Sequence, residues 1–499
     1  MGFLAGAARV DITPPLPVDL LGYVRRAQAA RGVWDPLLAT AAVLRGEGGV
    51  NVVVIAADVV GLTTEMSDRI RARVASAVSC RPEEVLLNSS HSHAAPWPGA
   101  PVKMGGEFDG WTETELRWWE SVPDLYASAA VQAAEQAVEA RVSGGVGRVK
   151  DVAVNRRERT PDGRTILGWN PDLFLDESVP TLRIDALDAP ADRPEAIATI
   201  VGFGCHPVVV GPEVPLVGSD FVGPLRDLLD GALRPDGVTI FLQGAAGNVL
   251  PLEAFRDEPG SAQGIGERLA LEAAHAVADR DPREIEVRHE AYGSVTPISL
   301  YRRQLATTQP VPVLRTTRRI VSLPMLEPPS VEDLERELAE RREDLRRRAE
   351  AGEGRATMNP VRYHIDWLAQ QLAAARSGPL PATVDGEVWA ARLGDTAIVG
   401  APGEIFGEIG AAVRAASPAP VTVFAGYSNG SLGYVATPEE YPFGGYEPAV
   451  SHRGYGHPAP FSPDVAGILE RVSLELLGEL FPEGPVADRV PAARPPVRG

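Results

Sequence analysis

Leu86-Leu87-Asn88-Ser89-Ser90-His91-Ser92-His93 joins an apolar run, typical of a buried strand, to two histidines separated by one residue. Side chains alternate between faces in an extended backbone, so His91 and His93 are predicted to point the same way. Two imidazoles on one side can bind one metal ion or one substrate. A His-x-His pair alone, in a chain with 8 histidines, is equally typical of surface or core histidines. Further residues must therefore support a metal site.

Apolar runs that end at a polar residue recur along the chain. They are 52–57 before Asp58, 198–205 before His206, 239–242 before Gln243, and 397–399, which leads to Glu404. Such runs are typical of strands buried on both faces in α/β proteins, where ligands bind beyond the carboxyl ends of the strands. His91, His206 and Glu404 are therefore predicted to meet, as catalytic zinc requires about three protein ligands and an open position. Each residue taken alone is equally consistent with a polar residue that only ends a strand.

Several motifs resemble the catalytic region of neutral ceramidases. They keep the order of that family over about the first 460 residues and comprise Ala7 to Pro14, Arg31 to Leu37, His91 to Pro96, Cys205-His206-Pro207, Pro402-Gly403-Glu404, Gly426 to Asn429 and Tyr434 to Tyr441. With the apolar runs, the resemblance predicts an α/β catalytic domain that contains a mixed, largely parallel buried sheet flanked by helices. The immunoglobulin-like carboxyl-terminal domain of full-length members is expected to be absent.

The resemblance also implies a role for each matching residue. The zinc ligands of the family match His91, His206, Glu404 and Tyr434, and the residues that contact the scissile amide match His93, Arg156 and Tyr446. Tyr455 resembles a further tyrosine on the substrate side, and Gly22 resembles a pocket glycine. The implied activity is hydrolysis of the amide bond of an N-acyl compound, dependent on one Zn²⁺ ion. Ceramide, a ceramide-like lipid and other N-acyl amines are candidate substrates.

These residue types suit amide hydrolysis. Zinc lowers the pKa of bound water towards roughly 7, so that hydroxide forms at neutral pH. Arg156 and Tyr446 can stabilise the negative charge that develops on the carbonyl oxygen. His93 can transfer a proton to the departing nitrogen, because an unperturbed imidazole titrates near neutral pH.

The segment Gly244-Ala245-Ala246-Gly247-Asn248 departs from the resemblance. The family tends to carry Ser-Asn-x-Gly-Asp there, and the serine and the aspartate are missing from this chain. The sequence therefore does not indicate which headgroup the substrate carries. Trp97, after the His-x-His pair, is expected to narrow the mouth of the pocket.

Two alternatives compete with a zinc hydrolase. Gly426-Tyr427-Ser428-Asn429-Gly430 fits the Gly-x-Ser-x-Gly pattern of serine hydrolases, with Ser428 as nucleophile. A nucleophile elbow leads into a helix, however, whereas Gly430, Gly433 and Pro438 follow here. The second alternative is a non-catalytic binding protein stabilised by zinc. The retained His93, Arg156 and Tyr446 argue against it, because a structural zinc needs no oxyanion donors.

Composition supports a soluble globular enzyme, with 44% hydrophobic and 23% charged residues. We predict one catalytic domain over 1–480, because ligands from 91 to 434 must meet, with a helical insertion at about 328–378. The Pro- and Arg-rich tail 481–499 is predicted to be disordered. A net charge of −19 disfavours nucleic acid and anionic membranes, so the expected partner is a small-molecule N-acyl substrate.

Local patterns predict two helical segments. Met66, Ile70, Val74 and Val78 recur at helical spacing between two apolar runs, which predicts a β-α-β unit with a parallel strand pair. Ser330 is predicted to begin a helix, capped with the help of Asp333, in an insertion that borders the pocket.

The cysteines and the amino terminus bear on the compartment. Cys80 and Cys205 are too few for a disulfide framework and are compatible with a reducing cytoplasm. Cys205 is predicted to be a buried, inert thiol, because it points away from the face that His206 occupies. No signal peptide is recognised and no apolar run approaches the ~18 residues of a membrane span, so a cytoplasmic location is predicted.

Overall fold

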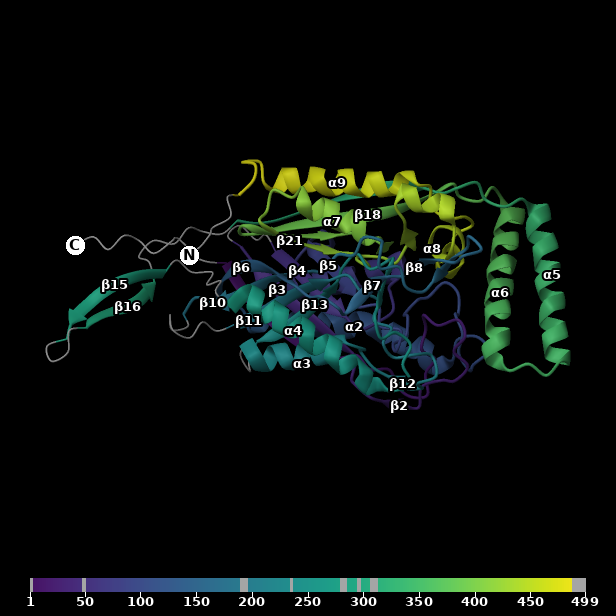
Figure 1. The fold of residues 1–499 in the computed structure, drawn as a ribbon, viewed down its shortest axis with the longest axis horizontal. Coiled ribbons are helices and arrows are strands. Elements are labelled where there is room, and N and C mark those ends of the chain that lie inside the picture. Colours follow the sequence, from purple (N-terminus) through teal and green to yellow (C-terminus); the bar gives the residue numbers. More distant parts are fainter. Residues whose placement is uncertain are drawn as a thin grey trace.

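The computed structural model describes residues 3–46, 51–188, 196–233, 237–278, 285–293, 298–305 and 313–486. The described elements form four layers in the order helices, large sheet, small sheet, helices (Figure 1). The α/β class predicted from the sequence, with a mixed sheet flanked by helices, is confirmed.

The large sheet contains eight strands. Their order is β13 (Val238–Gln243), β11 (Ala196–Phe203), β10 (Ser178–Ala186), β6 (Val138–Arg148), β1 (Phe3–Asp11), β3 (Leu38–Arg45), β4 (Asn51–Ala57) and β5 (Val85–Ser89). Only the two edge pairs, β11–β13 and β4–β5, are parallel; the five pairs between them are antiparallel. The expectation of a largely parallel sheet is therefore wrong. Five residues join β3 to β4 and nine join β10 to β11, whereas a parallel pair needs a crossover of about a dozen or more, so these neighbours pair antiparallel.

The small sheet explains why the apolar runs are buried on both faces. It consists of β17 (Leu314–Pro324), β18 (Thr383–Leu393), β19 (Thr396–Gly400) and β21 (Val421–Ala425). Leu86 and Ile200 of the large sheet share one apolar core with Trp389 and Ile398 of the small sheet. A second sheet thus covers the face that a helical layer covers in a doubly wound fold.

Helices cover the outer faces of both sheets. On the large sheet lie α1 (Thr64–Val78), α2 (Glu113–Glu135), α3 (Val222–Leu233) and α4 (Gln263–Ala278); on the small sheet lie α7 (Gly407–Ala415) and α9 (Asp464–Leu480). The predicted β-α-β unit is confirmed as β4-α1-β5. Its strands are parallel, and the four apolar residues of the α1 stripe are buried.

Two helices lie where the insertion was predicted, between β17 and β18. They are α5 (Val331–Glu350) and α6 (Arg355–Ser377), and they project from one end of the molecule (Figure 1). The hydroxyl oxygen of Ser330 accepts a hydrogen bond from the backbone N–H of Asp333, with an N to O distance of 3.1 Å, so the predicted helix start is confirmed. At the opposite end projects a separate ribbon of β15 (Ile285–Tyr292) and β16 (Ser299–Leu305) (Figure 1).

The remaining elements are short. Four strand pairs are β2 (Gly32–Val33) with β12 (Leu216–Val217), β7 (Ala153–Asn155) with β14 (Val249–Pro251), β8 (Arg157–Arg159) with β9 (Thr165–Leu167), and β20 (Glu404–Ile405) with β22 (Tyr434–Val435). Single helical turns are η1 (Pro82–Glu84), η2 (Pro259–Ala262), η3 (Pro438–Phe443), α8 (Tyr446–Ala449) and η4 (Ser451–Tyr455).

The chain stays packed a little beyond the predicted domain boundary at residue 480. Phe481 is buried, and the N–H of Val486 donates to the carbonyl of Pro418 at 2.9 Å. Residues 487–499, most of the predicted tail, lie outside the described residues. Within the described ranges, no helix combines the length and the apolar character needed to cross a membrane.

Candidate metal and catalytic site

Four strands of the two sheets end at one place, and each is followed by a residue of the candidate site. His91 follows β5 and His206 follows β11 in the large sheet. From the small sheet, Glu404 follows β19 and Tyr427 follows β21. The site therefore lies where the ends of the two packed sheets meet, as the polar strand endings in the sequence predict.

The four residues expected to bind zinc come together. Nε2 of His206 and Nε2 of His91 lie 3.0 Å and 3.4 Å from the same carboxylate oxygen, Oε2 of Glu404. The hydroxyl of Tyr434 lies 3.2 Å from Nε2 of His206. Parallel pairing of β20 with β22 sets Glu404 directly opposite Tyr434. Segments separated by more than 300 positions in the sequence thus converge on one point.

His93 joins this group. Its Nε2 lies 3.1 Å from Nε2 of His91, and one ring nitrogen from each of His91, His93 and His206 falls within 4.8 Å of the others. The convergence of His91 and His93 was predicted, but its premise, an extended backbone, is wrong. The strand β5 ends at Ser89, and His91 has a φ of 67°, in the left-handed region. A turn, fixed by donation from the N–H of His91 to the carbonyl of Val59, brings the rings together.

Backbone carbonyls orient two of the rings. Nδ1 of His91 lies 2.6 Å from the carbonyl oxygen of Val60, and Nδ1 of His206 lies 2.7 Å from that of Ala246. A carbonyl only accepts, so we assign the proton of each ring to Nδ1, which leaves the lone pair of Nε2 facing Glu404. A carbonyl behind a histidine is the usual outer partner of a metal-ligating imidazole. The arrangement fits a metal ion with nitrogen and oxygen ligands.

The charge states also fit. Burial lowers the pKa of His206 to about 4 and the pKa of His91 below its usual value, so both rings are neutral near pH 7. Burial alone would raise the pKa of Glu404, but its polar neighbours His91, His206 and Tyr434 outweigh it and hold the pKa at about 2, so the carboxylate is ionised. Neutral imidazoles and an ionised carboxylate are the forms that bind metal.

Arg156 lies beside the candidate metal ligands and is held in place by the carboxylate of Glu447, which the sequence did not reveal. Its Nη1 lies 3.2 Å from Nε2 of His206, and its guanidinium carbon lies 5.3 Å from the centre of the Tyr434 ring. Nε donates to Glu447 at 2.8 Å, and Glu447 also accepts from Arg157 at 2.6 Å. All three charged side chains are at most 4% exposed. The only sequence signal for Glu447 is its place directly after Tyr446.

Three tyrosines besides Tyr434 complete the group. The hydroxyls of Tyr427 and Tyr455 donate to the two oxygens of Glu404, Tyr427 at 3.1 Å. The Tyr446 ring lies 5.5 Å from the Tyr434 ring, and burial raises the pKa of its hydroxyl. Tyr455, expected on the substrate side, thus bonds to a metal-ligand candidate. Tyr427 gave no signal in the sequence because it occupies the variable position of Gly-x-Ser-x-Gly.

Comparisons with known proteins bear on the fold, although no protein-family model matches the chain. A 99-residue segment, 19% of this chain, is 31% identical to neutral ceramidases of Drosophila pseudoobscura pseudoobscura and Drosophila melanogaster, and spans only 14% of each relative. Neutral ceramidase from Pseudomonas aeruginosa superposes with a TM-score of 0.65 at 18% identity, over 97% of this chain and 75% of that chain. The fold is that of neutral ceramidase. A ceramidase complexed with C2 superposes similarly, with a TM-score of 0.64 at 17% identity, over 97% of this chain and 76% of that chain. The resemblance to neutral ceramidases found in the sequence is confirmed.

Gly22 lies behind His93 in this ceramidase fold. Its φ is 94°, which glycine adopts without strain, and a Cβ at this position would lie 2.5 Å from Cγ of His93. The neighbouring Tyr23 ring packs edge-on to His93 at 4.7 Å, and Arg26 donates to the His93 carbonyl at 3.1 Å. The segment 22–26 therefore positions His93.

Ser428 and Cys205, two possible nucleophiles near the ceramidase-like site, have structural environments. The buried hydroxyl of Ser428 is 3.1 Å and 3.0 Å from the carbonyls of Ala425 and Gly426, and it bonds to no histidine among the described residues. The chain after β21 does not enter a helix directly, so the requirements of a nucleophile elbow are not met. Burial raises the pKa of the Cys205 thiol well above its usual value, as expected for an inert cysteine.

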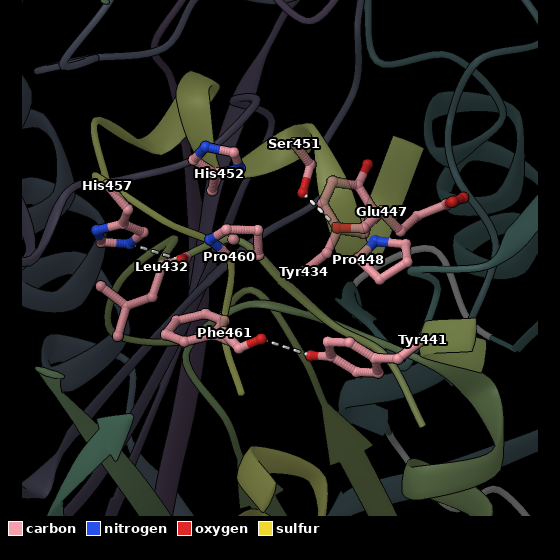
Figure 2. Close-up of a pocket in the computed structure, with 11 residues that line it drawn as sticks. Leu432, Tyr434, Tyr441, Glu447, Pro448, Ser451, His452, His457, Pro460 and Phe461 are labelled. Atoms are coloured by element: carbon pink, nitrogen blue, oxygen red, sulfur yellow. Dashed lines mark hydrogen bonds between the residues drawn. The ribbon is translucent and has the colours of Figure 1, made fainter. Parts of the chain in front are cut away.

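A cavity of about 10 Å³ lies at Tyr434, on the side lined by Glu447 and His452 (Figure 2). Two hydrogen bonds hold its walls in place. The hydroxyl of Ser451 donates to the carbonyl of Glu447 at 2.7 Å, and the hydroxyl of Tyr441 donates to the carbonyl of Phe461 at 2.9 Å. The space suffices for about one water molecule. The cavity is therefore too small for a ligand much larger than water.

Proposed function

We propose that the chain is a zinc-dependent amidohydrolase that cleaves the amide bond of an N-acyl compound. One observation carries the proposal: His91 and His206, each held at Nδ1 by a backbone carbonyl, present Nε2 to one ionised oxygen of Glu404. Two neutral imidazoles, a carboxylate and a phenol form a nitrogen and oxygen donor set that suits zinc. His91, His206, Glu404 and Tyr434 would hold the ion, which supplies activated water for attack on a carbonyl carbon.

The residues around this donor set suit the charge that the reaction develops. Arg156 stays protonated and, because Glu447 holds it from the other side, it does not have to move to meet a negative oxygen. Tyr446 is protonated at neutral pH and can donate to the same oxygen. Burial and the neighbouring imidazoles hold the pKa of His93 well below its usual value, so its ring is neutral and is a weaker base than the unperturbed imidazole assumed from the sequence. Its Nε2 is the atom that would pass a proton from the attacking water to the departing nitrogen.

The proposal does not specify the headgroup of the substrate. Asn248, which stands where the family carries an aspartate, accepts from the N–H of Gly407 at 2.9 Å and donates to Glu408 at 2.9 Å. Its backbone carbonyl accepts the N–H of Arg156 at 2.8 Å. This residue therefore connects Arg156 to α7. Ceramide is one candidate among N-acyl amines and N-acyl amino acids.

Metal content and turnover test the proposal together. We expect purified protein to hold one zinc per chain, to hydrolyse at least one member of a panel of ceramide, N-acyl amines and N-acyl amino acids, and to lose turnover reversibly on chelation. Arg156→Ala should keep its zinc and lose about 10²- to 10³-fold in kcat, the usual effect of removing one oxyanion donor. Arg69→Ala, which breaks an exposed ion pair with Glu120, is the matched control and should change neither.

Other outcomes would favour the two alternatives. Turnover that resists chelation and is stopped by a fluorophosphonate bound to Ser428 would establish a serine hydrolase. If the protein binds zinc but hydrolyses no member of the panel, and if Arg156→Ala does not change zinc binding, the protein is a zinc-stabilised binding protein.

A further inference from the structure

Gln243, the last residue of β13, joins the two histidine segments through their backbone carbonyls. Its side chain is fully buried, and Nε2 donates to the carbonyl of Ser90 at 3.0 Å and to the carbonyl of Cys205 at 2.8 Å. These residues directly precede His91 and His206. An amide nitrogen has two hydrogens, so both are used, one for each segment.

Asn88 holds Gln243 from the opposite edge of the large sheet. Its Oδ1 accepts the N–H of Gln243 at 2.8 Å, and its Nδ2 donates to the carbonyl of Gly426 at 2.6 Å. In the eight-stranded sheet β5 and β13 are the two edge strands, so no ladder of backbone hydrogen bonds within that sheet joins them. The two side-chain amides make this connection, and they extend it to the end of β21.

We propose that Gln243 and Asn88 are positioning residues that set the separation of His91 and His206, and thereby the metal geometry. The inference rests on the zinc site proposed above. The imidazoles reach Glu404 from strands that are not adjacent in the sheet, β5 at one edge and β11 beside the other edge. Removal of an outer group that orients a metal ligand commonly weakens metal binding 10- to 100-fold.

The surroundings of Gln243 make a clean substitution possible. Its Oε1 accepts no hydrogen bond from any described residue, so the side chain is held by its nitrogen alone. Gln243→Met keeps the length of the side chain and removes only the two donations. Leu269→Ala is the control, because Leu269 is buried in the core between α4 and the large sheet and takes part in none of the hydrogen bonds of Gln243. We expect it to lower stability and to leave those hydrogen bonds in place.

The experiment measures zinc affinity by competition with a chromophoric chelator, alongside the unfolding midpoint of the metal-free protein. We expect Gln243→Met to bind zinc 10- to 100-fold more weakly than wild type, and Leu269→Ala to bind within about 2-fold. The ¹⁵N imidazole signals of the metal-free proteins supply a second readout. Those of His91 and His206 should move in Gln243→Met, whereas those of His364 in the insertion should not.

Wild-type zinc affinity and unmoved imidazole signals in Gln243→Met would overturn the inference, and so would a loss of affinity that Leu269→Ala reproduces. If Gln243→Met does not fold, Gln243→Glu, which keeps the shape and removes the amide hydrogens, replaces it in the same measurements. If wild type binds no zinc, the proposed function fails, but the imidazole signals still test whether Gln243 positions the two histidines.

Discussion

Glu404 is a buried anion that is stabilised by hydrogen bonds from neutral groups. Two tyrosine hydroxyls donate to it, while the imidazoles of His91 and His206 face it through their lone pairs. The nearby guanidinium of Arg156 is already paired with Glu447. A buried charge is costly unless a partner compensates it, so the carboxylate and the two lone pairs together favour a cation. At the scale of single residues, the charge balance points to a metal ion.

The contact of Gly22 with His93 gives a prediction at this scale. We expect Gly22→Ala to lower the unfolding free energy by at least ~1 kcal/mol, because alanine is strained at positive φ. It should also lower kcat, because the new methyl group would displace the His93 ring. Gly163→Ala is the control: its φ of 83° is similar, but nothing lies within 4 Å of the added carbon. Denaturant unfolding and turnover measure both effects; equal losses of turnover in the two variants would contradict a role for the His93 contact.

At the scale of elements, the helical hairpin α5–α6 acts on the site through η4. Trp367 donates from Nε1 to the carbonyl of His457 at 2.9 Å, and Gln371 donates to the carbonyl of Gly456 at 3.0 Å. These carbonyls directly follow Tyr455, whose hydroxyl bonds to Glu404. The insertion therefore supports the segment that carries Tyr455.

Replacement of residues 330–378 by a short Gly/Ser linker tests this support. The two sheets should still fold cooperatively, because Pro324 pairs with Thr383 at the base of the insertion and the remaining ladder of β17 and β18 is retained. Zinc should stay bound, since no ligand candidate lies in the hairpin, whereas turnover should fall as Tyr455 loosens. Circular dichroism, metal analysis and kinetics check the three points. Unchanged turnover would show that η4 needs no support from α6.

At the scale of the whole molecule, the site connects the two sheets. His91 and His206 follow strands of the large sheet, while Glu404 and Tyr434 lie in the separate pair β20–β22, whose strands follow β19 and β21 of the small sheet in the chain. A metal bound only by the folded state stabilises it by about 2.7 kcal/mol when free metal is 100 times the dissociation constant. Zinc should therefore raise the melting temperature of the entire catalytic unit.

The free energy of unfolding of the metal-free protein should depend on pH in a defined direction. The folded-state pKa of His206 is about 4, below the unfolded value of about 6.5, so between these values the unfolded chain binds the proton that the folded chain excludes. Stability of the metal-free protein should consequently fall as pH drops from 6.5 to 4, by about 1.4 kcal/mol per pH unit for each such histidine. Thermal unfolding with and without chelator, at pH 7 and pH 5, measures the pH and zinc effects. A metal-free protein that is equally stable at both values would contradict buried neutral imidazoles.

Features that depend on residues close together in the chain could be predicted from the amino-acid sequence. Spacing of apolar residues predicted α1 and its parallel strands, Ser330 marked the start of α5, and ordered motifs predicted the ceramidase-like fold and the residues that now surround Glu404. These signals are readable because periodicity, capping and short motifs involve residues that are close in the chain.

The pairing of the strands and the partners that hold the site residues in place became known only from the folded chain. The antiparallel centre of the large sheet, the turn at His91, the carboxylate of Glu447 and the two donations of Gln243 all depend on contacts between distant segments. Gln243 and Ser90 are separated by 153 positions, and Arg156 and Glu447 by 291. No local pattern records such a contact, because the free energy that fixes it comes from burying both partners together in the folded chain.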